Sequence, residues 1–295
     1  MSLTNARILV TGAGGMLATD LVEALRDAGA RHLTLTDRAD LDITDAVAVD
    51  QAVRGHNVVI NCAAYTAVDA AEEDEHTAFA INATGPANLA AACARHGARL
   101  VHISTDYVFA GNATEPYAED ATPQPASAYG RTKAAGEQAV RESGADAVVV
   151  RTAWLYGRGG QCFPKTIARL VAERGSISVV SDQIGQPTWT RDVSAFIVRL
   201  LAAGAPAGTY HATSAGQCSW LDFAKAIVAS AGIAGTVEPT TSDAFPRPAP
   251  RPAWSVLGHG AHEALGIDGI GPWEERWALA ASEVLADAVG GRAAR

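Results

Sequence analysis

Apolar, strand-like runs alternate with helical patterns along the first half of this chain of 295 residues. Runs of β-branched and aliphatic residues bounded by turn signals are typical of buried strands. Helical stretches separate them, the clearest at 72–96 and 127–143. Because parallel strands need helical crossovers, the alternation predicts an α/β fold with a doubly wound parallel sheet of the Rossmann type. The five predicted strands lie at 7–11, 32–37, 57–62, 99–104 and 147–151.

The pattern becomes shorter and less regular after residue 151. We expect a helix near 163–174, a strand near 177–180, a helix at 190–203 and a closing helix over about 273–289. We therefore divide the chain into a first domain, 1–152, and a smaller C-terminal α/β lobe, 153–295. The motifs in the next paragraphs make the first a candidate dinucleotide-binding domain and the second mainly a substrate-binding lobe. The 190–203 helix is a candidate to return to the sheet of the first domain. A loop is expected where prolines gather, at Pro239, Pro246, Pro248, Pro250 and Pro252.

Composition and patterning argue against several classes of protein. The 23 basic and 32 acidic residues give a net charge of −9 without any basic block, so we expect no nucleic-acid partner. No run approaches the roughly 18 apolar residues of a membrane span. The first ten residues enter a strand without a basic and apolar leader, which predicts a cytoplasmic protein. Neither a metal site nor a disulfide framework is expected from the four widely spaced cysteines: Cys62, Cys93, Cys162 and Cys218.

A glycine-rich turn follows the first predicted strand. Residues 12–18 read Gly-Ala-Gly-Gly-Met-Leu-Ala, which is a G-x-x-G-x-x-A spacing between a strand and a helix. Glycines at such a turn let backbone N–H groups approach the pyrophosphate of a dinucleotide at the helix N-terminus. A tight strand–helix loop without a ligand is the alternative. The turn predicts cofactor contacts at Gly12, Gly15, Met16 and Leu17.

The end of the second predicted strand bears on the choice of cofactor. Asp37 stands where a carboxylate accepts hydrogen bonds from the adenosine ribose and repels a 2′-phosphate, which favours NADH. Arg38 follows at once and can pair with a 2′-phosphate, which favours NADPH. Because the two neighbours point in opposite directions, we expect NADPH or NADH. Asp37 can alternatively cap the turn that follows.

Tyr129 and Lys133 form the most informative pair in the chain. Only three lysines are present, so a Tyr-x-x-x-Lys spacing has a chance expectation of about 0.06. On a helix this spacing places the phenol and the ammonium on one face. A phenol with a pKa near about 10 is a slow acid–base group at neutral pH, and a nearby cation is expected to lower that pKa. An ordinary surface helix is the alternative.

A hydroxyl group is expected beside this pair, because the preceding predicted strand ends at the cofactor. The run Ser104-Thr105-Asp106-Tyr107 occupies that place. A hydroxyl there can donate to the carbonyl oxygen of a substrate and hold it beside the phenol. Together the three groups predict reduction of a ketone.

Longer segments extend these signals over nearly the whole chain and in order. They are LDITD at 41–45, NCAAYTAVD at 61–69, STDYVF at 104–109, RTAWLYG at 151–157, DQIGQPT at 182–188 and GTYH at 208–211. With the glycine turn and the Tyr-x-x-x-Lys pair, they resemble the dTDP-4-dehydrorhamnose reductase family of the extended short-chain dehydrogenase/reductase superfamily.

The resemblance implies a reaction and a set of residues. The reaction is NAD(P)H-dependent reduction of the C4 ketone of a dTDP-4-keto-6-deoxyhexose, first of all dTDP-4-dehydro-L-rhamnose to dTDP-L-rhamnose, and a homodimer is a candidate assembly. Thr105, Tyr129 and Lys133 would form the catalytic triad. The implied cofactor contacts are Asp42 and Ile43 at the adenine, and Ala63, Ala64 and Tyr65 towards the ribose and nicotinamide. The implied substrate contacts are Thr66, Val68, Asp106 and Trp154 at the sugar, and Arg251 at the diphosphate.

Departures from the family pattern fall on the expected substrate side. Cys162 stands where relatives usually have Asn. Trp254 also stands in place of Asn, and Gly258 stands in place of Asp or Asn. A related enzyme of secondary metabolism, resembling dihydrostreptose synthase or a deoxysugar 4-ketoreductase, is therefore an alternative. A non-catalytic nucleotide-binding regulatory subunit is a further one, which the intact triad argues against. Several ring side chains can instead be structural: Trp154 and Trp254 in packing, and His102 and His211 as hydrogen-bonded core residues.

Overall fold

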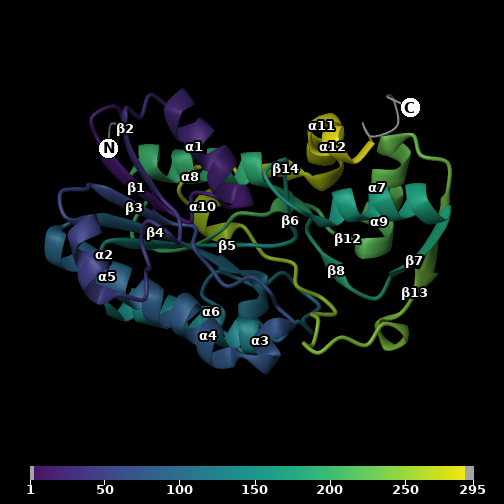
Figure 1. Cartoon of the computed structure of the whole chain (residues 1–295), viewed down its shortest axis with the longest axis horizontal. Helices are drawn as coiled ribbons and strands as arrows, with labels where there is room; N and C mark the ends of the chain where they lie inside the picture. Colours follow the sequence, from purple (N-terminus) through teal and green to yellow (C-terminus); the bar gives the residue numbers. More distant parts are fainter. Residues whose placement is uncertain (1–2, 290–295) are drawn as a thin grey trace.

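A six-stranded parallel sheet forms the centre of the molecule, for which the computed structural model describes residues 3–289 (Figure 1). The strand order is β10-β5-β4-β3-β1-β2, and every neighbouring pair is parallel. The predicted doubly wound parallel sheet is thereby confirmed. The six strands are β1 (Arg7–Thr11), β2 (His32–Thr36), β3 (Val58–Asn61), β4 (Arg99–Thr105), β5 (Ala147–Thr152) and β10 (Gly208–His211).

Helices cover both faces of this sheet. On the upper face in Figure 1 lie α1 (Met16–Asp27) and α8 (Thr190–Ala203), and on the lower face lie α2 (Ala46–Val53), α5 (Gly85–His96) and α6 (Ala128–Glu142). Side chains alternate along β1, so Ile8 and Val10 join the core under α1 and α8, whereas Leu9 joins the opposite core. Strands buried on both faces explain the apolar runs in the sequence.

Two elements after residue 152 belong to this first body. The predicted return of the 190–203 helix is confirmed, since α8 packs against α1 and buries Phe196 and Ile197 completely. The sequence analysis did not assign β10 to the main sheet, although it pairs with β5 along its whole length. The two lobes therefore alternate along the chain. A boundary at residue 152 leaves β10 and α8 on the other side from the five strands with which they form the first lobe.

The segment predicted as one helix over 72–96 is divided. It consists of α3 (Ala70–Glu73), α4 (Glu75–Phe79), a π-helical turn (η1, Ala80–Thr84) and α5. The break falls at Asp74, which has φ −134° and ψ 65° and whose carboxylate accepts from the N–H of Thr77. A carboxylate that caps a new helix competes with continuation of the previous one.

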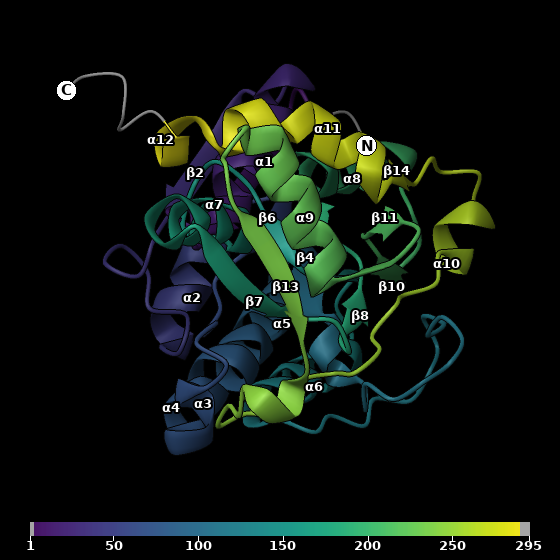
Figure 2. The same cartoon turned by 90° about the vertical axis from the view of Figure 1, so that its right-hand side faces the viewer.

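The second lobe packs around its own aromatic core. Tyr156, Phe223 and Trp277 lie at its centre and are almost fully buried. Figure 2 shows β7 (Ser176–Val180) beside β13 (Thr236–Thr240), and α7 (Phe163–Arg174) and α9 (Trp220–Ala231) pack on this pair. The predictions of α7 and β7 are confirmed. The predicted closing helix ends at Val284 as α11 (Trp273–Val284), and α12 (Ala286–Val289) follows it.

Short elements account for the rest of the secondary structure in residues 3–289. The remaining strands are β6 (Leu155–Tyr156), β8 (Ile184–Gly185), β9 (Thr188–Trp189), β11 (Ser214–Ala215), β12 (Cys218–Ser219) and β14 (Ile270–Pro272). The remaining helices are the 3-10 turns η2 (Asp106–Val108) and η3 (Ser242–Ala244) and the α-helix α10 (Gly260–Glu263). Among the described residues, no helix combines the length and the apolar character that crossing a membrane requires.

Candidate active site

A cleft of about 1120 Å³ opens at the carboxyl ends of the parallel strands. This edge is where ligands of doubly wound sheets bind. All but one of the predicted site residues line it: Gly12, Gly15, Met16, Leu17, Asp37, Arg38, Asp42, Ile43, Ala63, Ala64, Tyr65, Thr66, Val68, Thr105, Asp106, Tyr129, Lys133 and Trp154. Arg251 is the exception, and it lines a second cavity described below.

The glycine turn brings backbone close to backbone at one end of this cleft. Gly12 has φ +67°, and a Cβ placed on it would lie 2.7 Å from the backbone nitrogen of Ala63. Any other residue would therefore displace the backbone of Cys62 and Ala63, which directly follows β3. Gly15 begins α1, and among residues 3–289 no side chain caps this helix end. The first N–H groups of α1 thus remain available to an anion.

The acidic residues predicted to contact the adenosine are partly engaged with their own loops. The Oδ1 atom of Asp37 accepts from the backbone N–H of Ala39 at 2.7 Å, which is the turn-capping role considered as its alternative. Asp42 accepts from the N–H and the hydroxyl of Thr44, and these bonds lower the pKa of its carboxyl. Ile43 is mostly buried and contributes a small apolar surface to the cleft.

Helix α6 places Tyr129 and Lys133 on the cleft side, as their spacing predicts. Ser127 caps the helix by accepting from the N–H of Gly130 at 3.1 Å. The Nζ atom of Lys133 donates to the carbonyl of Ile103 at 2.6 Å, which ties the helix to the end of β4. Burial lowers the pKa of Lys133 to about 8, although the nearby charges of Glu137 and Cys62 act to raise it.

The electrostatic expectation for Tyr129 was wrong in its direction. Burial raises the pKa of the phenol well above its usual value, and the hydrogen bond with Thr105 is what acts to lower it. The predicted lowering by Lys133 is not found, because desolvation of the phenol dominates and the ammonium is directed to the Ile103 carbonyl. Tyr129 is therefore held as a neutral proton donor.

Asp106 lies beside this pair and is almost fully buried. It accepts from the hydroxyl of Thr105 at 2.9 Å and from the hydroxyl of Ser255 at 2.6 Å. Burial raises the pKa of Asp106 to about 6, and these hydrogen bonds act to lower it. Ser255 was missed as a site residue, and its position directly after Trp254, between two departures from the family pattern, was the available signal.

A buried ion pair supports α6 from behind. Glu137, one turn after Lys133, accepts from Ser104 at 2.6 Å and from Arg151 at 2.8 and 2.9 Å. Burial acts to raise the pKa of Glu137, but the bonds from Arg151, Ser104 and Arg141 hold it below its usual value. Sequence reasoning missed this carboxylate, although its spacing of four from Lys133 placed it on the same helix face.

A second cavity of about 700 Å³ adjoins the cleft, with Tyr107 lining both. Trp154, with φ +46°, is the one non-glycine residue of positive φ among those described, and its ring stacks at 3.5 Å on Trp220. Because Trp154 lines the cleft and Trp220 the cavity, the stacked pair stands between the two. Sequence analysis missed the cavity, whose other lining includes Phe163, Ile177, Phe245, Arg174, Arg247 and Arg251.

Arg251 reaches this cavity from the proline-rich segment. Its Nη2 atom donates to Oδ1 of Asp69 at 2.9 Å, and Arg247 binds the other oxygen of the same carboxylate. Trp254 pairs through its backbone with Asn112 and Ile184, which fits its packing alternative. The structural alternative for both histidines is confirmed: His102 and His211 are fully buried and lie within hydrogen-bond distance of Asn61 and Gly258, respectively.

Comparison with known proteins agrees with this geometry. The family described as "RmlD substrate binding domain" matches residues 6–286. A dTDP-4-dehydrorhamnose reductase of Streptomyces griseus is 47% identical over 275 residues, which is 90% of each chain. The chain belongs to the dTDP-4-dehydrorhamnose reductase family. Another relative, from Streptomyces antibioticus, is a probable dTDP-4,6-dihydroxy-2-methyloxan-3-one 4-ketoreductase, 46% identical over 95% of this chain and 96% of its own length.

A solved structure of the same reductase family carries a dinucleotide. The dTDP-4-dehydrorhamnose reductase of Bacillus anthracis in complex with NADP matches with a TM-score of 0.90 and 41% identity, covering 93% of this chain and 98% of that one. The residues of this chain fit such a group. The uncapped start of α1 beside the glycine turn suits a pyrophosphate, and Arg38 beside Asp37 suits either adenosine ribose.

Within residues 3–289 of this reductase-family chain, no group of three His, Cys, Asp or Glu side chains is arranged to hold a metal ion.

Proposed function

We propose that this chain reduces the C4 ketone of a dTDP-linked 4-keto-6-deoxyhexose with NADPH or NADH. One observation carries the proposal: the phenol of Tyr129, the ammonium of Lys133 and the glycine turn line a single cleft. Ketone reduction needs a proton donor and a dinucleotide site within one cavity. The intact triad argues against the regulatory-subunit alternative.

The side chains divide the work around the carbonyl oxygen. The reduced nicotinamide supplies a hydride when bound. Tyr129 donates the proton that the new alkoxide requires, and Thr105 hydrogen-bonds the same oxygen and orients it. With a pKa of about 8, Lys133 is largely charged at neutral pH, so its ammonium stabilises negative charge that develops beside Tyr129.

The nucleotide half of the substrate fits the second cavity. Phe163 and Trp220 offer an aromatic wall to a thymine base, and the guanidinium groups of Arg247 and Arg251 suit a diphosphate. Tyr107 lines the passage from there to the cleft, where Thr66, Val68, Asp106 and Trp154 would meet the sugar.

The first candidate reaction is dTDP-4-dehydro-L-rhamnose to dTDP-L-rhamnose, as in the named Streptomyces griseus relative. A 4-ketoreductase of a related deoxysugar is the second candidate. It is supported by the Streptomyces antibioticus relative and by the departures on the substrate side, since Cys162 directly precedes Phe163, which lines the second cavity. Whether the chain works as a homodimer stays a prediction.

The test is oxidation of NADPH or NADH at 340 nm with dTDP-4-keto-L-rhamnose, followed by identification of the product by NMR. Tyr129→Phe should keep cofactor affinity and lose most turnover, by roughly 10²-fold or more. Tyr210→Phe is the matched control, because that hydroxyl binds the carbonyl of Pro206 away from the cleft. An undiminished kcat in Tyr129→Phe would contradict the assignment.

A further inference from the structure

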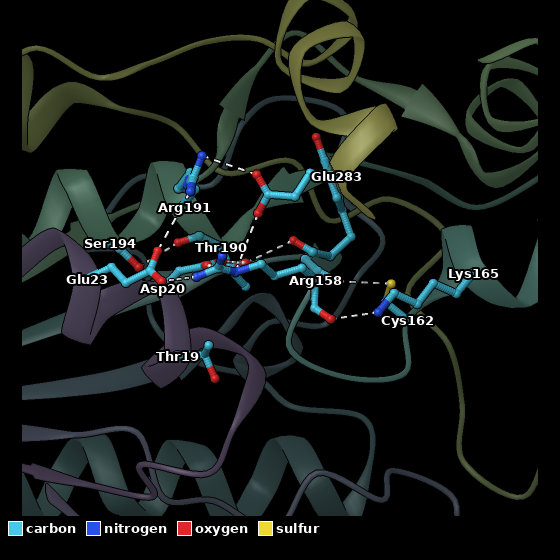
Figure 3. Close-up of polar contacts among 12 residues, drawn as sticks. Thr19, Asp20, Glu23, Arg158, Cys162, Lys165, Thr190, Arg191, Ser194 and Glu283 are labelled. Carbon is cyan, nitrogen blue, oxygen red and sulfur yellow. Dashed lines mark hydrogen bonds and ion pairs between the residues drawn. The ribbon is translucent and has the colours of Figure 1, made fainter. Parts of the chain in front are cut away.

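Arg158 is the centre of an ionic network that joins three helices to one loop. It lies in the segment 157–161 that connects β6 to α7. Its Nε atom is 3.2 Å from Oδ1 of Asp20 and 3.5 Å from Oε1 of Glu283, and its Nη2 atom pairs with Glu23. Arg191 of α8 closes the ring, 3.1 Å from Glu283 and 3.7 Å from Glu23. Figure 3 shows Arg158 reaching between the carboxylates of α1 and α11.

The loop that carries Arg158 forms a wall of the dinucleotide cleft. Gly159, Gly160 and Gln161 line the cleft together with the glycine turn. A Cβ on Gly159 would lie 3.1 Å from the hydroxyl of Thr19 and 3.4 Å from Cα of Met16. The loop therefore passes directly over the first turn of α1, the helix end that the proposed cofactor requires.

One member of the network is buried, whereas Arg158 is 31% exposed and Glu23 is 44% exposed. Asp20 is fully buried, and its other oxygen accepts from Thr190 of α8 at 2.5 Å. Among the described residues, neither Nε of Arg158 nor Oδ1 of Asp20 forms a hydrogen bond, so charge attraction holds the two together. Loss of Arg158 would leave the buried carboxylate without this cation, which is costly. From the other side, Lys165 of α7 donates to the carbonyl of Arg158 at 2.7 Å.

We propose that Arg158 is a positioning residue for the dinucleotide, which holds the 157–161 loop against the start of α1 and so closes the phosphate end of the cleft. The inference rests on the proposed function, because it assumes that a dinucleotide occupies this cleft. Arg158 acts through the backbone of Gly159 and Gly160 and through Asp20. Its loss should loosen cofactor binding while leaving the proton donor and the sugar site in place.

The test is calorimetric titration of the full chain with NADPH, together with steady-state kinetics. Arg158→Ala should raise the Kd for NADPH by roughly tenfold, with kcat at saturating cofactor and the KM of the nucleotide sugar within about twofold of wild type. Arg169→Ala is the control, because Arg169 forms an exposed pair with Glu173 on α7, away from the loop. It should leave the Kd unchanged.

Glu283→Gln keeps the inference testable if Arg158→Ala does not fold. It removes one partly buried carboxylate of the network, which is 26% exposed, and should raise the Kd for NADPH by roughly two- to threefold. Folded variants with the Kd of wild type would overturn the inference, even if their melting temperature fell, since the network would then serve stability alone. If wild type binds NADH in place of NADPH, the same variants are titrated with NADH; a wild-type chain that bound neither dinucleotide would instead contradict the proposed function itself.

Discussion

At the scale of single residues, burial sets the protonation of the cleft more strongly than charge pairing does. Tyr129, Lys133 and Asp106 are displaced from their usual pKa values, each toward the neutral form. The sequence placed all three at the cleft, because strand ends and helix faces follow from patterning. The depth at which each group lies depends on both lobes, so the direction of the Tyr129 shift could not be read from its spacing with Lys133.

The pH dependence of stability tests the effect of burial on Asp106. The pKa of its carboxyl is about 6 in the folded chain, against an unfolded value of 3.8, so the folded state binds the extra proton between these pH values. Its contribution to stability therefore rises as pH falls from about 6 to about 4, and above pH 6 the buried charge is a cost. Asp106→Asn should raise the free energy of unfolding at pH 7 by up to about 3 kcal/mol, and by much less at pH 4.

Chemical denaturation of both chains at pH 4, 5, 6 and 7 measures this difference. The control is Asp120→Asn, which makes the same carboxyl-to-amide change at an exposed position. A constant difference between Asp106→Asn and wild type across the range would mean that Asp106 titrates normally.

At the scale of elements, α6 and β4 act as one catalytic unit. The helix holds the strand end at two successive residues, through Lys133 to the carbonyl of Ile103 and through Glu137 to the hydroxyl of Ser104. The sequence predicted both elements within one or two residues, because each has a clear period and α6 has a serine cap. The break at Asp74 was not predicted, since the helical pattern continues through a residue whose side chain caps the next helix.

Glu137→Gln should weaken this unit in two ways. Arg151, which is 1% exposed, would lose its carboxylate partner, and we expect the free energy of unfolding to fall by roughly 3–5 kcal/mol. Because Glu137 acts to raise the pKa of Lys133, the alkaline fall in kcat expected near pH 8 should move to lower pH. Denaturant unfolding and a pH profile of kcat measure the two effects.

The control for this prediction is Arg141→Ala, since Arg141 binds the same carboxylate from an exposed position. This substitution should lower the free energy of unfolding by less than about 1 kcal/mol and should not shift the pH profile of kcat. Wild-type stability in Glu137→Gln would show that the pair with Arg151 does not support the helix.

At the scale of the whole molecule, the cleft was predictable and the second cavity was not. Cofactor residues follow the ends of successive strands, and a parallel sheet brings those ends to one edge whatever the details of packing. Phe163, Trp220 and Arg251 come from separate segments of the second lobe, and their meeting depends on how those segments pack. The pairing of β10 with β5 could not be predicted for the same reason, because the sequence of a four-residue strand does not show which strand it pairs with.

The interleaving of the lobes predicts that residues 1–152 do not fold alone. Such a fragment lacks β10 and α8, and α8 alone buries five large apolar side chains against the sheet: Val193, Phe196, Ile197, Leu200 and Leu201. At about 1.5–3 kcal/mol each, their burial contributes about 7–15 kcal/mol, which equals the whole net stability of a typical domain. The fragment should therefore show no cooperative thermal transition by circular dichroism, whereas the full chain does. A cooperative transition together with NADPH binding by the fragment would instead mean that the first five strands form an independent domain.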